Sequence, residues 1–472
     1  MMNLKKLKRI LYLPLIVSMI VSGSLQPAMG FTVGEEKEMG EKLLYTVRAS
    51  FPLLDDPDLH QYINQIGHEV LDVAGIQFFD YHFYIVESSQ FNAFAAPSGL
   101  IFFYSKLIES MNSEDELISV MAHEVGHVVR RHLASRLKKG KIINFASMGA
   151  ALAAIALGGG AAAQGLLAGS LAAGQSAQLH FSRQDEIEAD LLAYQWMQDM
   201  HRDTVGQKKM LQTMRRITRY RTGQIPQYLL THPDPEARLD YVSSLIAADQ
   251  DYKVENEDSK NFSFIRFKYR IMSLTQKATT ARAFLASEIS DSRSSDFEKN
   301  MALYGLAQID RRTNNFEQSL ARMDEVISAF PDKPILLVDK AVVLADKGDY
   351  LQARMLLEQV KRTEPNNSYV LFNLGKVLAS LGDSDQAVKL LKEVAYDIPE
   401  FADVYFEIGK ILSGQGKDVE ARYYLGKFNL YEGQLKLAEA NFKQVVGKTE
   451  EQSEVGRDSR EMLELIERLK KK

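Results

Sequence analysis

The sequence of 472 residues contains no cysteine, which excludes thiol nucleophiles, thiolate metal ligands and disulfide cross-links. Any metal-dependent chemistry must therefore use His, Asp and Glu side chains, and the chain has nine His. An excess of positive charge is also missing, because 57 Lys and Arg stand against 62 Asp and Glu, a formal net charge of −5. This balance argues against a nucleic-acid partner, whose recognition normally requires a basic surface.

The apolar runs of the sequence are short or interrupted for a segment that crosses a membrane. The segment Lys5–Arg9 is basic, Ile10–Val21 is apolar but short for a span, and the small residues Ala28 and Gly30 precede Phe31. This order predicts a secretory signal peptide over residues 1–30, with an uncleaved N-terminal anchor as the alternative. Its removal takes away four positive charges, so the net charge falls from −5 to about −9. We expect export to the periplasm.

A second uncharged stretch, Ile142–Ala173, consists largely of Ala, Gly, Leu and Ile. The run Gly158–Gly160 interrupts any single helix, and each half is shorter than the ~20 residues that a spanning helix needs. The pattern predicts a helical hairpin that is buried or serves as a lid. The alternative is a hairpin that contacts the membrane surface or an unfolded substrate.

The front half otherwise mixes helices with strands. The aromatic and β-branched runs Tyr81–Val86 and Leu100–Tyr104 predict strands, and Ala93–Gly99 between them has the composition of a turn. A helix is expected from Ser113 to Lys139, where Ser113 and Glu116 have the spacing of a capping box.

The back half repeats with a period of 34 residues. Four sets of positions recur in one register: Pro331, Pro365 and Pro399; Gly348, Gly382 and Gly416; Ala353, Ala387 and Ala421; and Ala341, Gly375 and Gly409. The period and the order of small residues, turn glycine and proline match the tetratricopeptide repeat, a helix–turn–helix unit. We expect three regular repeats, one degenerate copy before them and at least one after. Such arrays present a concave surface to peptides or partner proteins, and a purely structural solenoid is the alternative.

The motif HEVGH at residues 123–127 has the residue types and spacing of a metal-binding catalytic site. A spacing of four places His123 and His127 on the same face of a helix, where both imidazoles can bind one Zn²⁺. Glu124 lies between them in sequence and is suited to act as the general base that activates a water molecule. Two core histidines on a helix are the alternative interpretation. We favour a zinc site.

A zinc site of this kind needs a third protein ligand. The segment Phe181–Asp190 (FSRQDEIEAD) follows the uncharged stretch and is predicted to be helical. Glu186 and Asp190 share a face of this helix, whereas Glu188 points elsewhere. Spacing alone leaves either Glu186 or Asp190 as the ligand, with the other holding a histidine ring.

HEVGH followed by SRQDEIEAD resembles the gluzincin metallopeptidases related to the CAAX prenyl proteases, and in particular their periplasmic branch that contains tetratricopeptide repeats. The resemblance implies a mostly helical α+β chain: a zincin-like domain with a small sheet over residues 31–255, then an all-α repeat solenoid over 260–472. It implies one Zn²⁺ per chain. The roles it implies are ligands for His123, His127 and Glu186, general base for Glu124, support of the ligands for Asp190, and a helix-anchoring ion pair for Arg183.

Two further segments carry the same resemblance. Asn92–Gly99 (NAFAAPSG) is similar to a family segment whose following strand pairs with the substrate backbone, which implies substrate contacts for Asn92, Ala93, Phe94, Ala95 and Gly99. Thr231–Pro233 (THP), followed by Arg238, resembles a family motif whose histidine comes near the zinc. His232 then stabilises an oxyanion or fills the open coordination position; a helix-capping or surface role is the alternative.

Together these features predict a periplasmic zinc endopeptidase that hydrolyses misfolded or stalled outer-membrane proteins, with the repeats recruiting substrate or assembly machinery. Peripheral contact with the membrane is a further expectation. The alternative is a chaperone or scaffold for outer-membrane protein assembly whose peptidase activity is minor or latent.

Overall fold

The computed structural model describes residues 32–139, 181–220, 227–249, 252, 258–450 and 452–470. The predicted signal peptide over residues 1–30 and the predicted hairpin over 142–173 lie outside these ranges. Within the part of the chain that the structure describes, no helix combines the length and hydropathy that crossing a lipid bilayer requires.

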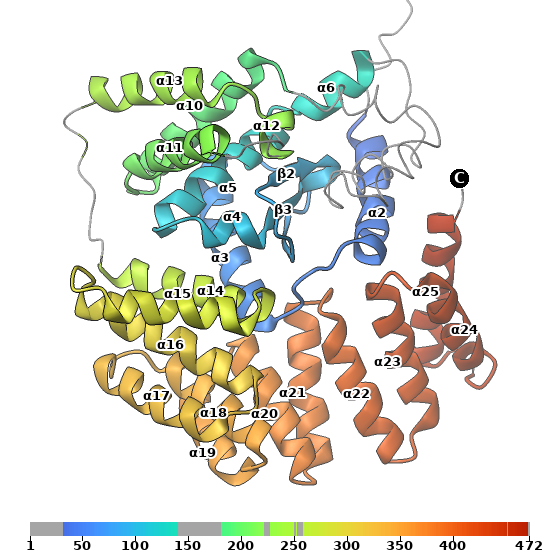
Figure 1. Ribbon diagram of the computed structural model, residues 1–472. Helices are drawn as coiled ribbons and strands as arrows, with labels where there is room; N and C mark the ends of the chain where they lie inside the picture. The colour runs from blue at the N-terminus through green and yellow to red at the C-terminus, as the bar shows by residue number, and fades with distance from the viewer. Residues whose placement is uncertain are drawn as a thin grey trace, which may run out of the picture.

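The front part of the chain is a small sheet covered by helices (Figure 1). Its helices are α2 (Val33–Ser50), α3 (Pro57–Ala74), α4 (Ser105–Glu109), α5 (Glu114–Val129), α6 (His132–Lys139), α10 (Arg183–Asp199), α11 (Val205–Tyr220), α12 (Gln227–Thr231) and α13 (Pro235–Ala248). The strands are β1 (His82–Val86), β2 (Ala93–Ala96) and β3 (Leu100–Tyr104), and a short 3-10 turn at Pro97–Gly99 joins the last two. The strand order is β1-β3-β2, with β1 parallel and β2 antiparallel to the central β3.

Apolar side chains cover both faces of the sheet, which explains the continuous apolar runs of its strands. Alternate residues such as Phe83, Ile101 and Phe103 belong to the main core with α3, α5, α10, α11 and α14. The intervening residues, among them Tyr84 and Phe102, pack against α2. The sheet therefore forms a rigid base for α5, the helix that carries HEVGH.

Two sequence predictions for this part are wrong. Residues 113–139 do not form one helix, because α5 ends at Val129 and Arg131 adopts a left-handed backbone (φ 52°) before α6 begins. Residues 93–96, expected in a turn, form β2, because Ala93, Phe94, Ala95 and Ala96 are all buried against the sheet's two cores.

The predicted capping box at the start of α5 is only half formed. The Ser113 hydroxyl accepts a hydrogen bond from the Glu116 backbone N–H (3.4 Å), but the Glu116 side chain is buried and its Oε2 has no hydrogen-bond partner. Burial raises the pKa of the Glu116 carboxyl to about 7, against the effects of a hydrogen bond from Asn112 and the charge of Lys209.

This buried carboxyl predicts a loss of stability as the pH rises from acidic to neutral. The folded-state pKa lies above the unfolded value of about 4.3, so folding binds the proton more tightly and stability decreases as pH rises from about 4.3 to 7. Glu116→Gln is expected to exceed the wild type in stability by about 1–3 kcal/mol at pH 8 and to come close to it at about pH 4. Urea unfolding at both pH values measures this. An unchanged pH dependence in the variant would contradict it.

The back part is an all-helical solenoid that curves beneath the front part, as Figure 1 shows in yellow to red. Its helices are α14 (Asp258–Thr275), α15 (Ala278–Ser290), α16 (Asp296–Arg312), α17 (Phe316–Ala329), α18 (Ile335–Lys347), α19 (Tyr350–Lys361), α20 (Ser368–Ser380), α21 (Ser384–Asp397), α22 (Ala402–Gly414), α23 (Asp418–Tyr431), α24 (Leu435–Val446) and α25 (Glu454–Lys470). The pairs α18/α19, α20/α21 and α22/α23 are the three regular repeats. Their turn glycines Gly348, Gly382 and Gly416 all have positive φ, the backbone conformation that the repeating glycine predicts.

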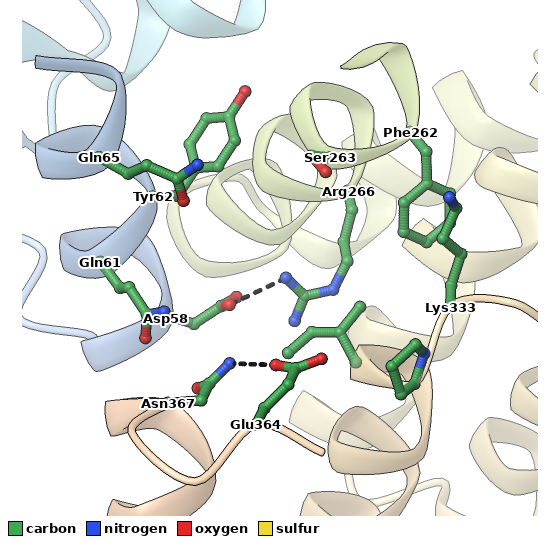
Figure 2. Close-up of a pocket in the computed structure, with 12 residues that line it drawn as sticks. Asp58, Gln61, Tyr62, Gln65, Phe262, Ser263, Arg266, Lys333, Glu364 and Asn367 are labelled. Atoms are coloured by element: carbon green, nitrogen blue, oxygen red, sulfur yellow. Dashed lines mark hydrogen bonds and ion pairs between the residues drawn. The ribbon is translucent and has the colours of Figure 1, made fainter. Parts of the chain in front are cut away.

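The solenoid contacts the front part through a buried ion-pair cluster. Its six members come from both parts of the chain: Asp56, Asp58, Arg266, Arg270, Asp339 and Tyr369. Arg266 of α14 donates to Asp339 (2.8 and 3.0 Å) and to Asp58 (2.9 Å), as Figure 2 shows for the second pair. Arg270 donates to Asp56 (2.8 Å) and to the Tyr369 hydroxyl (3.0 Å). A cavity of about 280 Å³ lies beside this cluster, between α3, α14 and the loops of the repeats.

A second contact joins the N-terminal helix to the far end of the solenoid. The Arg48 guanidinium of α2 donates to the Tyr431 carbonyl (3.1 Å) and to Glu400 (3.3 Å), and the Tyr84 hydroxyl of β1 also donates to Glu400. The repeats thus contact the sheet domain both at α14 and at the loop before α22 and the end of α23.

Candidate metal centre

The site lies where α5 packs against α10. Helix α5 carries His123, Glu124 and His127, and all three side chains are buried. A Cβ atom at Gly126 would lie 3.4 Å from the Ala189 Cα, so this position has room for little more than a methyl group. The small residues Gly126 and Ala189 therefore let the two helices approach closely enough for Glu186 to meet the histidines.

Four buried side chains gather their donor atoms into one cluster: His123, His127, Glu186 and His232, with all ligand atoms within 4.8 Å of one another. The two Nε2 atoms of His123 and His127 are 3.0 Å apart. Glu186 lies 3.5 Å from each of them through its two oxygens, and His232 Nδ1 is 3.0 Å from Glu186 Oε1. Imidazole nitrogens with one carboxylate form a donor set that suits Zn²⁺.

Glu124 lies directly beside this cluster. Both of its carboxylate oxygens are buried without a hydrogen-bond partner, as is His232 Nε2, which lies 3.4 Å from Glu124 Oε1. Buried polar atoms without partners are rare in folded proteins and costly. Their concentration next to four convergent donors fits a site that holds a metal and reacting groups.

Asp190 and Arg238 support the cluster from behind. Asp190 Oδ1 lies 2.9 Å from His123 Nδ1, so the carboxylate accepts the Nδ1 proton and leaves Nε2 facing the cluster. Arg238 donates to both oxygens of Asp190 (2.8 and 2.7 Å) and pairs with Glu186 (2.9 Å). Burial would raise the pKa of Asp190, but Arg238 and His123 hold it below its ordinary value, and the carboxylate stays charged.

The two HEVGH histidines differ in their affinity for protons. Burial and the neighbouring His123 lower the pKa of His127 well below its ordinary value. Burial and Arg238 also act to lower the pKa of His123, but Asp190 and Glu186 outweigh them and raise it to about 9. A metal ion must displace the proton that His123 holds in the metal-free protein, so metal uptake releases a proton and weakens with falling pH.

The structure separates the other predicted site residues into one that joins the donor cluster and others that do not. Of the two carboxylates that spacing left open, Glu186 joins the donor cluster and Asp190 contacts His123 from behind. Glu188 lies outside the cluster. Arg183 is also remote from it, because its side chain is 80% exposed and pairs with Asp234 (3.0 Å), the residue that caps α13.

The expectation for the strand after NAFAAPSG is wrong. That strand is β3, whose two edges are already paired with β1 and β2, so its backbone has no free edge for a substrate. The edge strands are β1 and β2, and the outer edge of β1 is met by Leu53, which bridges to Val86. Among the described residues, no strand pairs with the outer edge of β2, which carries Ala93, Phe94 and Ala95. Asn92 is buried at its start, and Gly99 has a left-handed backbone (φ 81°) in the turn that follows.

The structure adds three residues that sequence reasoning missed. The Phe181 ring stacks on His127, with ring centroids 3.9 Å apart, and the Tyr228 ring stacks on His232 at 4.4 Å. His132 contacts the second nitrogen of His127. A signal existed for Tyr228, which precedes His232 by one helical turn; none existed for His132, because its place depends on the break between α5 and α6.

Comparison with known proteins agrees with this geometry. Residues 57–246 match the model of peptidase family M48, and residues 304–368 and 344–406 match tetratricopeptide repeat models. The chain contains an M48 metallopeptidase domain. This domain includes every residue of the donor cluster, and the repeats follow it in sequence. The family matches and the helices and strands of the structure together confirm the predicted architecture, a mostly helical α+β domain followed by repeats.

The M48 domain has relatives with named activities. The beta-barrel assembly-enhancing protease of Escherichia coli strain K12 is 28% identical over 348 residues, 69% of each chain. The protein of that name from Yersinia pestis is 35% identical over 210 residues, 44% of this chain and 43% of the relative. The mitochondrial metalloendopeptidase OMA1 of Schizosaccharomyces pombe is 25% identical over 207 residues, 43% of this chain and 59% of the relative.

Proposed function

We propose that the chain is a zinc-dependent endopeptidase of the periplasm that hydrolyses unfolded or misassembled outer-membrane proteins. The observation that carries the proposal is the buried cluster His123, His127, Glu186 and His232, with Glu124 unpartnered beside it. The name of the Escherichia coli and Yersinia pestis relatives supports the substrate class. The repeats then recruit substrate or assembly machinery.

In this proposal His123, His127 and Glu186 hold the zinc ion. When bound, zinc polarises the scissile carbonyl and makes a water molecule acidic enough to ionise near neutral pH. Glu124 takes the proton of the attacking water and transfers it to the leaving amine. Its burial without competing hydrogen bonds leaves both oxygens available for these transfers.

The substrate lies along β2 in this proposal. Ala95 and Ala96 of β2 line a small cavity together with His127 and Phe181, so the strand runs past the donor cluster. An extended peptide that adds to the outer edge of β2, with which no described strand pairs, gains backbone hydrogen bonds that do not depend on sequence. Such binding suits an enzyme for unfolded proteins.

His232 limits activity at rest in this proposal. Its Nδ1 lies 3.4 Å from His123 Nε2, and its Nε2 lies 3.4 Å from Glu124 Oε1, so the ring fills the space between His123 and Glu124. A substrate carbonyl needs this space, and hydrolysis therefore requires the ring to move.

The test is removal and return of the metal. Incubation with a zinc chelator is expected to abolish cleavage of an unfolded outer-membrane protein, and about one equivalent of Zn²⁺ is expected to restore it. Metal content is measured by elemental analysis and cleavage by gel electrophoresis. His123→Ala is the control and should not recover with zinc. Undiminished cleavage by the metal-free protein would refute the proposal.

A further inference from the structure

The second ring nitrogen of His127 has an unusual partner. His127 Nδ1 lies 2.9 Å from Nδ1 of His132, and His132 Nε2 lies 3.2 Å from Glu188 Oε2. The side chain of His132 is buried, and that of Glu188 is 37% exposed. A continuous row of hydrogen-bonding groups thus leads from the protein surface to a histidine of the donor cluster.

The backbone between α5 and α6 is distorted in a way that creates this contact. If α5 continued, the five residues from His127 to His132 would turn the side chain about 140° around the helix, away from the cluster. Arg131 instead adopts a left-handed backbone (φ 52°), which is costly for a residue with a Cβ atom and is typical of functional sites. Its guanidinium donates to Glu36 (2.7 and 3.0 Å), which holds the turn in place.

We propose that His132 and Glu188 are positioning residues that fix the ring orientation and tautomer of His127. The Nδ1–H of His127 donates to Nδ1 of His132, and the Nε2–H of His132 donates to the Glu188 carboxylate. His127 Nε2 then carries a lone pair directed at the donor cluster. The assignment rests on the proposed metal site and goes beyond it, because neither residue touches the cluster's metal-facing atoms.

The other HEVGH histidine offers an internal comparison. His123 reaches a carboxylate directly, through Asp190 at 2.9 Å, whereas His127 reaches one through an intervening imidazole. Loss of such an outer partner typically weakens metal binding 10–100-fold. We expect the loss of His132 to weaken metal binding by a factor in that range. The loss of Glu188 should weaken it less, because Glu188 is one step further from the cluster and partly exposed.

The experiment measures the zinc dissociation constant by competition with a chromophoric chelator at fixed pH. His132→Ala is expected to raise it about 10–100-fold, and Glu188→Ala about 3–10-fold. The double variant should equal His132→Ala alone, because Glu188 acts through His132. Asp199→Ala, which removes an exposed carboxylate at the end of the same helix, is the matched control and should not change affinity. Circular dichroism checks the fold of each variant.

His132→Asn separates the two contacts if the alanine variant folds poorly. Its amide oxygen stands near the position of Nδ1 and keeps an acceptor for His127, but the link to Glu188 is lost. We expect His132→Asn to bind zinc with the same affinity as Glu188→Ala. Adding Glu188→Ala to His132→Asn should not weaken zinc binding further. The positioning roles would be overturned if a folded His132→Ala variant bound zinc with wild-type affinity. They would also be overturned if Glu188→Ala weakened zinc binding as much in the His132→Ala background as in the wild type. Absence of zinc binding by the wild type would overturn the proposed function with them.

Discussion

Replacing Glu124 by Gln is expected to lower kcat/KM for peptide hydrolysis by about 10²–10⁴-fold, the range that a positioned general base contributes. Gln keeps the size of the side chain but cannot take a proton from water. Its position supports a large effect, because Glu124 is completely buried and lies 3.4 Å from His232 Nε2, inside the site. Cleavage of an unfolded outer-membrane protein, followed over time, is the measurement.

The same variant separates an enzyme from a scaffold. Zinc content and thermal stability should remain those of the wild type, because Glu124 is not one of the four clustered donors. Glu236→Gln, at an exposed carboxylate that pairs with surface arginines, is the control and should keep full activity. If Glu124→Gln cells maintained outer-membrane protein assembly as well as wild-type cells, the chaperone or scaffold role would be the main one.

The second large effect concerns the buried ion-pair cluster between the peptidase domain and the repeats. Asp339→Ala is expected to destabilise the protein by about 3–5 kcal/mol, the usual result of removing one partner from a buried pair. The Asp339 side chain is fully buried, and it accepts hydrogen bonds from Arg266, Arg270 and Tyr369. Two guanidinium groups that cannot lose their charge would remain without this carboxylate.

Thermal unfolding and hydrogen exchange measure this loss. We expect faster exchange in α14 and α20, whose residues meet at the cluster, and a lower Tm. Asp291→Ala removes a carboxylate from an ion pair with Arg293, whose side chain is 88% exposed, and should leave stability nearly unchanged. Equal effects of the two variants would contradict the stabilising role of the buried cluster.

Local patterns made much of the fold and site predictable. The spacing of His123 and His127 depends only on helix geometry, and the repeating glycines depend only on a turn that each 34-residue unit needs. Spacing predicts that one of Glu186 and Asp190 is a metal ligand and that the other holds a histidine ring. Which residue has which role depends on how closely α10 approaches α5. That approach depends on tertiary packing at Gly126 and Ala189, which a single sequence does not reveal.

The failures have physical causes of the same kind. The left-handed backbone of Arg131 is a conformation that its residue type does not favour, and it persists because Glu36, 95 residues earlier, binds the side chain. The sequence predicts a turn over 93–99 because Pro97, Ser98 and Gly99 have turn chemistry, and the alanines before them have little strand preference. Residues 93–96 form a strand because they pair with β3 and are buried.

The contact between Arg48 and the far end of the solenoid bears on the order in which the chain assembles. The guanidinium binds groups that lie 352 and 383 residues later in the sequence, so α2 is synthesised long before these partners. Contacts of such separation form slowly, because a long loop must close before they contribute any stability. A chain that stops before Glu400 lacks both partners. The docked position of α2 therefore requires that the chain has been made at least as far as Tyr431.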